Sequence, residues 1–520
     1  MTALRKPASL LFPFFLVFAL ACGSGSNTDS GDGPGQGTDL PTTDTTDTTD
    51  TSDQPGDPPE QQAFVRPNIA SLDADGIAAF RTGVQAMKSR PASDPTSWLY
   101  QANMHGTYDT PALEAWNSCQ HGTFFFLSWH RMYLYYFERI LRKASGDPNF
   151  ALPFWDYTNP AQRAIPEPLR NPANAQNPLF VAERNPGINE GAQIPASATT
   201  FTQAMNFTNF TSPAGSGLSF GGQRVAQPVH FGGVFGQIES QPHNIIHVLV
   251  GGQEGWMSDP NLAARDPIFW LHHANIDRLW NVWKAREGGR VDPTDQNWLN
   301  QVFVFFDENG QRVEMTGQQV VDSAQQLKYT YAEGSGDEPG LQGVGEDFPA
   351  AAFTDNRREV VVDRRAPTRL TRERARVTVP GIPVAEAESV DGPRRLTLSI
   401  EGIKFGRPGI YYEVYANLPQ NAQPNPTSPH FVGNLAVFGQ LEDGQSAHAG
   451  HGGPNKSLQN DATLTYEITA LIERLRGQQG FQGNLDLHFV PRGLETDRPG
   501  LESVGETREV RFERVRIIRE

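Results

Sequence analysis

Histidine is the residue type through which this sequence can do chemistry. The chain has 12 histidines among 520 residues, and eight of them fall in the first half of the body: His105, His121, His130, His230, His243, His247, His272 and His273. The pair in PHNIIH is four residues apart, so on a helix both side chains lie on one face, as two ligands of one metal ion require. A lone histidine on an apolar face is usually a core residue. Here, in contrast, six of the histidines form two groups of three, each near a helix and surrounded by Trp and Phe. This arrangement indicates metal binding.

The ligand type narrows the choice of metal. Imidazole ligands in an apolar surrounding suit copper or zinc, and a pair of ions that reacts with O2 favours copper. The zinc-protease motif HExxH does not occur in the sequence, which removes the most common competing interpretation of two histidines four residues apart.

The elements that must position these histidines are helices. Apolar residues recur at helical spacing in 73–90, 131–144, 242–250 and 268–286, and long loops rich in Gly, Pro and Asn separate them. From about residue 365 apolar and polar residues alternate, as in strands, and one helix is expected near 466–476. The predicted strands are 394–400, 409–416, 485–490 and 508–518.

Charge and composition exclude two classes of function. Of the net charge of −16, residues 1–22 carry +2 and residues 23–60 carry −9, which leaves −9 on the body. A mildly acidic body without a basic face argues against nucleic-acid binding. No apolar run long enough to span a bilayer follows the N-terminus, so the body is not expected to cross a membrane. His448 and His451 lie in a glycine-rich segment that gives no rigid ligand geometry, so we expect a polar loop there, with a role in metal relay as the alternative.

The N-terminus is expected to direct export. A short basic start precedes an apolar run that ends in Ala-Leu-Ala-Cys-Gly, which resembles the lipobox of bacterial lipoproteins and makes Cys22 the lipidated residue. An ordinary cleaved signal peptide is the alternative. The acidic Thr/Asp/Gly tract that follows cannot bury a core and is expected to be a disordered tether. The predicted location is therefore outside the cytoplasm, lipid-anchored at the bacterial outer membrane or cell surface.

The histidine segments resemble a known family. HGTFFFLSWHRMYLYYFERIL is similar to the first copper motif of the tyrosinase and polyphenol oxidase family, and PHNIIHVLVGG with DPIFWLHHANIDRLW is similar to the second. The resemblance continues through DPTSWLYQANMHG, FALPFWDY, LKYTY and LDLHFVPRG, and it covers nearly all of residues 64–495.

The resemblance implies two copper ions, each held by three histidines, with O2 as co-substrate. It assigns His105, His121 and His130 to the first ion and His243, His247 and His273 to the second. His272 is then a neighbour of the ligands, although the two adjacent histidines could exchange roles.

The resemblance also implies a cross-link. In fungal relatives a cysteine in the Cys-x-His position forms a thioether with the histidine, which implies a bond from Cys119 to His121. A free buried thiol is the alternative. Plant relatives carry their thioether cysteine where this chain has Asp109, so the chain combines a plant-type domain layout with a fungal-type cross-link.

Two further residues are assigned to proton transfer. Glu239 and Asn244 match the Glu and Asn that, in the family, hold a water that takes the proton of a monophenol, although Glu239 could instead be a charge at a helix N-terminus. Asp277, one helical turn after His273, is expected to orient a ligand, or else to pair with Arg278 or cap a helix.

These features together predict a fold and a function. The fold is a mainly α copper-binding four-helix-bundle catalytic domain with long loops, followed by a C-terminal β-sandwich-like domain. The function is that of a type 3 dicopper oxidase that uses O2 to oxidise o-diphenols, and to hydroxylate monophenols, to o-quinones. A catechol oxidase without monophenolase activity and a haemocyanin-like O2-binding protein remain alternatives. Expected partners are small phenols or catechols, and membrane contact is expected only through the lipid anchor.

The expected organisation has six parts: signal peptide 1–22, linker 23–62, catalytic dicopper domain 63–290, intermediate domain 291–356, Arg-rich linker 357–376 and C-terminal β domain 377–520. In plant and fungal relatives the C-terminal domain covers the dicopper site until this domain is removed. The Arg-rich linker, with eight arginines, is therefore expected to be an exposed target for proteases.

Overall fold

The computed structural model describes most of the chain after the predicted tether. The described residues are 63–211, 218–335, 358–383, 395–404, 406, 409–439, 461–478, 480–494 and 509–520, and they belong to one compact unit, Gln61–Glu520. The predicted signal peptide, Cys22, the linker 23–62, His448 and His451 lie outside the described residues. None of the described helices is long and apolar enough to cross a membrane.

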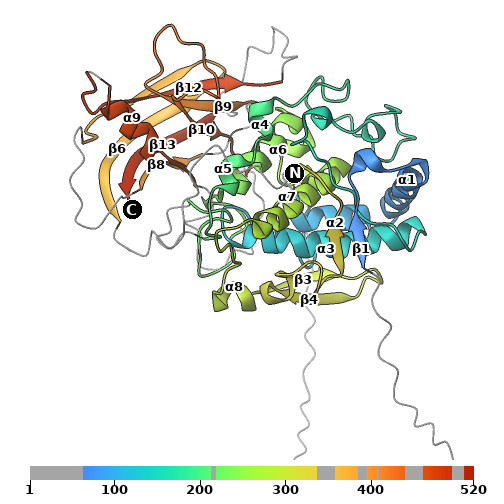
Figure 1. The fold of residues 1–520 in the computed structure, drawn as a ribbon. Helices are drawn as coiled ribbons and strands as arrows, with labels where there is room; N and C mark the ends of the chain where they lie inside the picture. The colour runs from blue at the N-terminus through green and yellow to red at the C-terminus, as the bar shows by residue number, and fades with distance from the viewer. Residues whose placement is uncertain are drawn as a thin grey trace, which may run out of the picture. The chain divides into compact units, whose positions relative to one another are not determined.

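Four helices carry histidines of the two predicted groups (Figure 1): α2 (Trp98–His105), α3 (Phe125–Ser145), α6 (Asn244–Gly251) and α7 (Pro267–Ala285). A fifth, α1 (Ala74–Lys88), packs on α3 through a buried face. At this contact Gly83 is so close to α3 that an added Cβ would lie 2.7 Å from a side-chain carbon of Leu141, so a larger residue would force α3 or this side chain to shift. Short helices α4 (Ala196–Thr199), α5 (Thr202–Met205) and α8 (Gln296–Asn300) lie in the connections.

The helix boundaries follow local signals. Asp73 caps α1, and Asp266 followed by Pro267 begins α7. Gly146 ends α3 in the left-handed conformation, with φ of 76°. The helix predicted at 131–144 in fact begins earlier, at Phe125. Its first two turns are buried on all sides, so they show no amphipathic period from which the start could be predicted.

Two small sheets close the helical core. β1 (Phe64–Arg66) pairs in parallel with β5 (Tyr329–Tyr331), and β3 (Val302–Phe306) pairs antiparallel with β4 (Arg312–Thr316). The first pair brings Arg66 and two tyrosines beside α7, where they meet Asp277.

The second half consists of two sheets on either side of one hydrophobic core. The four-stranded sheet has the order β10-β9-β12-β7, and the five-stranded sheet has the order β2-β11-β8-β13-β6. Their bounds are β2 (Gly233–Val234), β6 (Glu359–Leu370), β7 (Ala375–Val379), β8 (Leu396–Ile403), β9 (Tyr411–Ala416), β10 (Phe431–Leu435), β11 (Ala462–Glu467), β12 (Leu485–Arg492) and β13 (Val510–Arg519). The helix α9 (Thr469–Arg476) follows β11.

The fold class predicted from the sequence is confirmed, with two corrections. The expected Arg-rich linker 357–376 is wrong for most of its length, because Glu359–Leu370 and Ala375–Val379 are strands of the β domain. Val362, Ala366 and Leu370 of β6 are buried, whereas Arg365 and Arg369 are exposed, so one side of the strand packs on the core while these arginines lie toward solvent. The second correction is β2, which comes from the helical half but pairs in parallel with β11.

Candidate metal centre

The first histidine group comes from α2, α3 and the loop between them. His105 is the last residue of α2 and His130 lies in the second turn of α3. His121 lies in the loop before α3, and the ligand atoms of the three lie within 4.8 Å of one another. Gly106 follows His105 directly, and an added Cβ there would lie only 2.7 Å from the carbonyl oxygen of Pro260, so a side chain would push this backbone away.

The second group comes from α6 and α7. His243 directly precedes α6, and His247 follows one turn later on the same face. Their ligand atoms and those of His272 and His273 lie within 4.8 Å of one another. The His273 ring also stacks on His130, with centroids 4.4 Å apart, so the two groups are in contact.

Hydrogen bonds orient the rings so that one nitrogen stays bare. Nδ1 of His105, His130 and His247 lies 2.7–2.8 Å from the backbone carbonyls of Pro260, Phe126 and Met257. A carbonyl accepts only, so each Nδ1 carries the proton and each Nε2 presents a lone pair.

The bare nitrogens are the evidence for a cation. Nε2 of His105, His121, His130 and His243 is buried and has no hydrogen-bond partner among the described residues. Nε2 of His247 lies 3.3 Å from Nε2 of His273. Buried polar atoms are rarely left without partners, and a metal ion in each group would satisfy them. The donor set therefore fits two ions.

The protonation state is also the one that metal binding needs. Burial lowers the pKa of His105 and of His243 to about 3. Burial also lowers the pKa of His121, His130 and His273, and the neighbouring imidazoles lower it further. The rings are neutral at physiological pH, so no proton competes with the metal.

The structure brings His272 to the same place. Its ring lies against His243, with centroids 5.2 Å apart, and both of its nitrogens are buried without partners among the described residues. His273 is the member of the adjacent pair whose Nε2 faces His247 and whose ring faces the first group. Both histidines belong to the second group, and the assignment of His273 as the ligand stays a prediction.

Cys119 lies beside the first group. Its sulfur is buried, 3.3 Å from Nδ1 of His121. The same sulfur lies 3.3 Å from Nδ1 of His230, a histidine to which the sequence analysis gave no role.

Of the two residues predicted for proton transfer, Asn244 contacts the second group, and the carboxylate of Glu239 lies beside the loop that carries His121. Both carboxylate oxygens of Glu239 accept from the backbone N–H of Gly122, at 2.9 and 3.0 Å. Burial raises the pKa of Glu239 well above its ordinary value, and this N–H only partly opposes the shift. Asn244 accepts from Nδ1 of His243 at 2.9 Å, and its Nδ2 has no partner among the described residues.

Asp277 acts on the helices rather than on a ligand ring. Its carboxylate accepts from Arg131, the neighbour of His130, and from Arg66, at 2.5 and 3.3 Å. Two tyrosine hydroxyls donate to it as well. The predicted alternative of a pair with Arg278 is not what is found, since the guanidinium of Arg278 lies 3.7 Å from Asp156.

The β domain contributes a residue that the sequence analysis missed. Phe438, which follows β10, stacks on His247 with ring centroids 3.8 Å apart and an interplanar angle of 19°. Its ring also lies within about 6 Å of three other histidines: His105 at 6.2 Å, His121 at 5.6 Å and His243 at 5.8 Å. Neither spacing nor composition signals this residue, because the contact joins positions that are far apart in the sequence.

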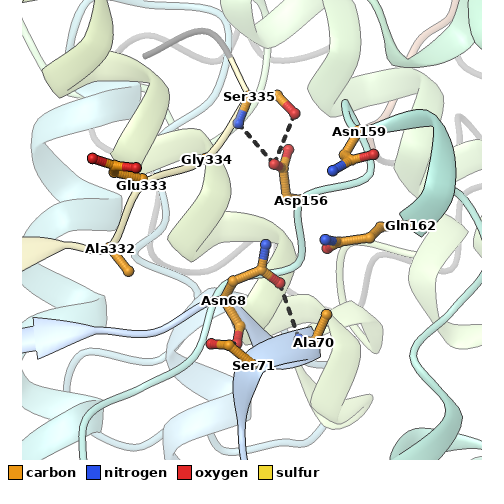
Figure 2. A pocket seen from close by; sticks show the side chains of 10 residues that line it. All are labelled: Asn68, Ala70, Ser71, Asp156, Asn159, Gln162, Ala332, Glu333, Gly334 and Ser335. Atoms are coloured by element: carbon orange, nitrogen blue, oxygen red, sulfur yellow. Dashed lines mark hydrogen bonds between the residues drawn. The ribbon is translucent and has the colours of Figure 1, made fainter. Parts of the chain in front are cut away.

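A polar cleft of about 910 Å³ lies elsewhere (Figure 2) and is lined by none of the histidines. The carboxylate of Asp156 accepts there from the backbone N–H and hydroxyl of Ser335, both at 2.8 Å. Its carboxylate is thus already occupied by protein donors, and the candidate site remains the histidine centre.

Comparison with known families agrees with this geometry. A family model described as the common central domain of tyrosinase matches residues 95–286, which include all seven histidines of the two groups. The polyphenol oxidase middle domain matches residues 292–336, and a domain of unknown function matches residues 355–520.

Relatives of known name cover the chain to different extents. Tyrosinase HcTyr1 of Hahella sp. is 32% identical over 482 residues, which is 83% of this chain and 96% of the relative. The latent form of chloroplastic polyphenol oxidase of Prunus armeniaca is 36% identical over 280 residues, 49% of this chain and 46% of the relative. The chain thus matches about half the length of that plant relative.

The solved structure of latent apple tyrosinase shares the fold. It is 23% identical, has a TM-score of 0.61, and the match covers 89% of this chain and 98% of that one. Similarity to the Hahella relative over most of both chains, the tyrosinase central-domain match and two histidine groups that fit copper lead to one conclusion. The chain belongs to the tyrosinase and polyphenol oxidase family of dicopper oxidoreductases.

Proposed function

We propose that this protein uses O2 to oxidise o-diphenols to o-quinones and also hydroxylates monophenols. The observation that carries the proposal is the set of buried Nε2 atoms without hydrogen-bond partners in two adjoining histidine groups, one of three residues and one of four. When bound there, two copper ions supply the one-electron chemistry that couples reduction of O2 to oxidation of a phenol. The polypeptide holds the ligand rings rigidly, mainly through backbone carbonyls.

Glu239 and Asn244 provide the proton transfer that a monophenol requires. A phenol is protonated at neutral pH and must lose its proton to bind a metal ion as phenolate. Nδ2 of Asn244 is buried without a partner among the described residues, and the carboxylate of Glu239 is buried beside Gly122; we propose that these two polar groups hold a water at the histidine centre. We assign to that water, with Glu239, the removal of the phenol proton.

The test is oxygen uptake by the copper-loaded full-length protein with tyramine and with catechol. Wild type should consume oxygen with both. Glu239→Gln keeps the size and the oxygen that accepts from Gly122, so catechol turnover should persist while tyramine turnover falls by about 10²–10⁴-fold, the usual contribution of a general base.

Each other outcome selects an alternative. Catechol turnover without tyramine turnover in wild type makes the protein a catechol oxidase. Uptake with neither, with two copper ions bound and the site opened as described below, leaves a haemocyanin-like O2-binding protein.

We also propose that the C-terminal β domain keeps the site closed. Phe438 covers the face of His247, and Asn434 of β10 donates to Gln241, two residues before His243. A phenol ring that approaches the second histidine group would need the space that Phe438 fills. The structural neighbour from apple is itself described as latent, which supports the proposal.

Two further proposals complete the function. The first is a thioether between Cys119 and His121, supported by their 3.3 Å contact.

The second is export and lipid anchoring at Cys22. Cys22→Ser should move the protein from the detergent-rich to the aqueous phase of a Triton X-114 partition, and an unchanged partition would refute the anchor.

A further inference from the structure

Cys119 lies between two imidazoles, only one of which belongs to a predicted ligand group. Its sulfur is 3.3 Å from Nδ1 of His121 and 3.3 Å from Nδ1 of His230. Cys119 is fully buried, and Nε2 of His230 is buried without a partner among the described residues.

Each residue of the segment 229–231 contacts one of three consecutive residues, 119–121, in the loop before α3. The backbone N–H of Val229 donates to Oε1 of Gln120 at 2.8 Å. Nδ1 of His230 donates to the backbone oxygen of Cys119 at 2.9 Å. The ring of Phe231 stacks on His121, with centroids 4.7 Å apart and an interplanar angle of 11°; these last two contacts fix the backbone of 119 and the ring of 121.

These contacts restrict the position of the Cys119 sulfur relative to the His121 ring. The bond to the Cys119 carbonyl fixes the backbone from which the sulfur projects, and it also fixes the tautomer of His230, with the proton on Nδ1. The stacked phenyl ring limits rotation of the His121 ring. Holding two reacting groups at contact distance in a fixed orientation is the main requirement for a bond to form between them.

We propose that His230 is a positioning residue for formation of the Cys119–His121 thioether, acting through its Nδ1–H donor to the Cys119 carbonyl. The inference rests on the proposed cross-link. In that reaction the S–H bond of Cys119 and one ring C–H bond of His121 break and an S–C bond forms. The two protons and two electrons released pass to O2, the co-substrate, which becomes hydrogen peroxide.

The variants are chosen by which nitrogen they replace. His230→Asn puts an amide nitrogen where Nδ1 was and keeps the donor. His230→Gln puts its nitrogen at the position of Nε2, and His230→Leu has no donor. His430→Leu is the matched control, because Nδ1 of His430 makes the same type of bond, 2.9 Å to the carbonyl of Ala416, within the β domain.

The measurement is the rate of cross-linking after copper-free full-length protein receives copper in air. The peptide containing Cys119 and His121 is followed by mass spectrometry for the loss of two hydrogens, together with the remaining free thiol. Wild type, His230→Asn and His430→Leu should cross-link at similar rates. His230→Leu and His230→Gln should be slower by about fivefold, the rate equivalent of about 1 kcal/mol for one lost hydrogen bond.

Three results would overturn the inference. If His230→Leu cross-links as fast as wild type, His230 does not position the sulfur, although the thioether stands. If His230→Asn is as slow as His230→Gln, the Nδ1 donor is not the cause, and this comparison decides the question even if the leucine variant does not fold. If wild type never loses the two hydrogens, the proposed thioether and this inference fail together.

Discussion

At the scale of single residues, the backbone rather than acidic side chains orients the ligand rings. Three predicted ligands donate from Nδ1 to backbone carbonyls, so these contacts do not depend on a second side chain. The other predicted ligands differ: Nδ1 of His243 has the side chain of Asn244 as its partner, Nδ1 of His121 faces the Cys119 sulfur, and Nδ1 of His273 has no partner among the described residues. Partners of metal ligands fix the ring orientation and affect metal affinity.

Asn244→Leu should therefore weaken copper binding at the second group. Loss of such a partner typically lowers metal affinity by about 10–100-fold. In competition with a chelator, the variant should release one copper ion at a lower chelator concentration than wild type. Asn244→Asp keeps an acceptor oxygen and should retain both ions, so equal release from Asn244→Leu and wild type would contradict this role.

At the scale of elements, a buried charge cluster ties α3 to α7. Asp277 on α7 pairs with Arg131 on α3 and with Arg66 on β1, and the side chain of Arg131 also lies over the Trp280 ring, 3.7 Å from its centroid. Burial alone would raise the pKa of Asp277, but the two arginines and two tyrosine hydroxyls outweigh it and lower the pKa below its ordinary value. The cluster thus connects the helix that carries His130 to the helix that carries His273.

Asp277→Asn should destabilise the protein by about 3–5 kcal/mol at neutral pH, because it leaves the buried guanidinium of Arg131 without its counter-charge, while Arg66 keeps only its pair with Glu138. A lowered pKa contributes stability above the ordinary value of about 3.9, and that contribution is lost as pH falls through the folded-state value. The difference from wild type in urea unfolding should thus shrink below about pH 4. Asp363→Asn is the control.

Asp363 pairs with Arg514 and Arg516 but is exposed on the β domain, so its removal should cost less than about 1 kcal/mol. Equal losses in the two variants would show that the buried cluster has no special role.

At the scale of the whole molecule, each half contributes residues to the core of the other half. β2 of the helical half is an edge strand of the β domain's five-stranded sheet, and Phe235 lies in that domain's core. In return, Phe438 and Tyr411 of the β domain belong to the core around the helices. The β domain is thus joined to the site at the loop that carries His230 and at the face of His247.

Phe438→Ala should open the site without any cut. A stacked aromatic pair contributes about 0.5–1.5 kcal/mol beyond its buried area, so kcat/KM for catechol should rise by up to about tenfold. Phe431→Ala removes an aromatic that packs on Tyr415 instead and should leave turnover unchanged. Equal turnover by wild type and Phe438→Ala, with no further gain on adding SDS, would refute the closed site.

A cut between residues 335 and 358 should not release the β domain. Besides the β2–β11 pairing, Tyr411 bonds Ser197 and Asn434 bonds Gln241 across the two halves. The two fragments should co-elute in size-exclusion chromatography and separate only on denaturing gels. Phe235→Ala, which should cost about 3–5 kcal/mol, ought to let the cut fragments separate. Separate elution of the cut wild-type fragments under native conditions would contradict the shared strand.

Much of the fold and the centre could be predicted from the sequence because their signals are local. Helical spacing predicted α1, α6 and α7 closely, and alternation predicted the strands of the second half. The spacing in PHNIIH placed two ring nitrogens on one face, and two groups of histidines in apolar segments indicated metal binding. These features depend on neighbours within one or two turns of the chain.

Only the tertiary structure decided which distant residues complete the site. His230 and Phe438 reach the centre from a loop and from another domain, and nothing in their local sequence indicates this. The arginines at 357–376 were misjudged for the same reason, because their exposure on one face of a strand depends on the core that covers the other face. Local periodicity determines the elements and their buried faces, whereas long-range packing determines which faces meet.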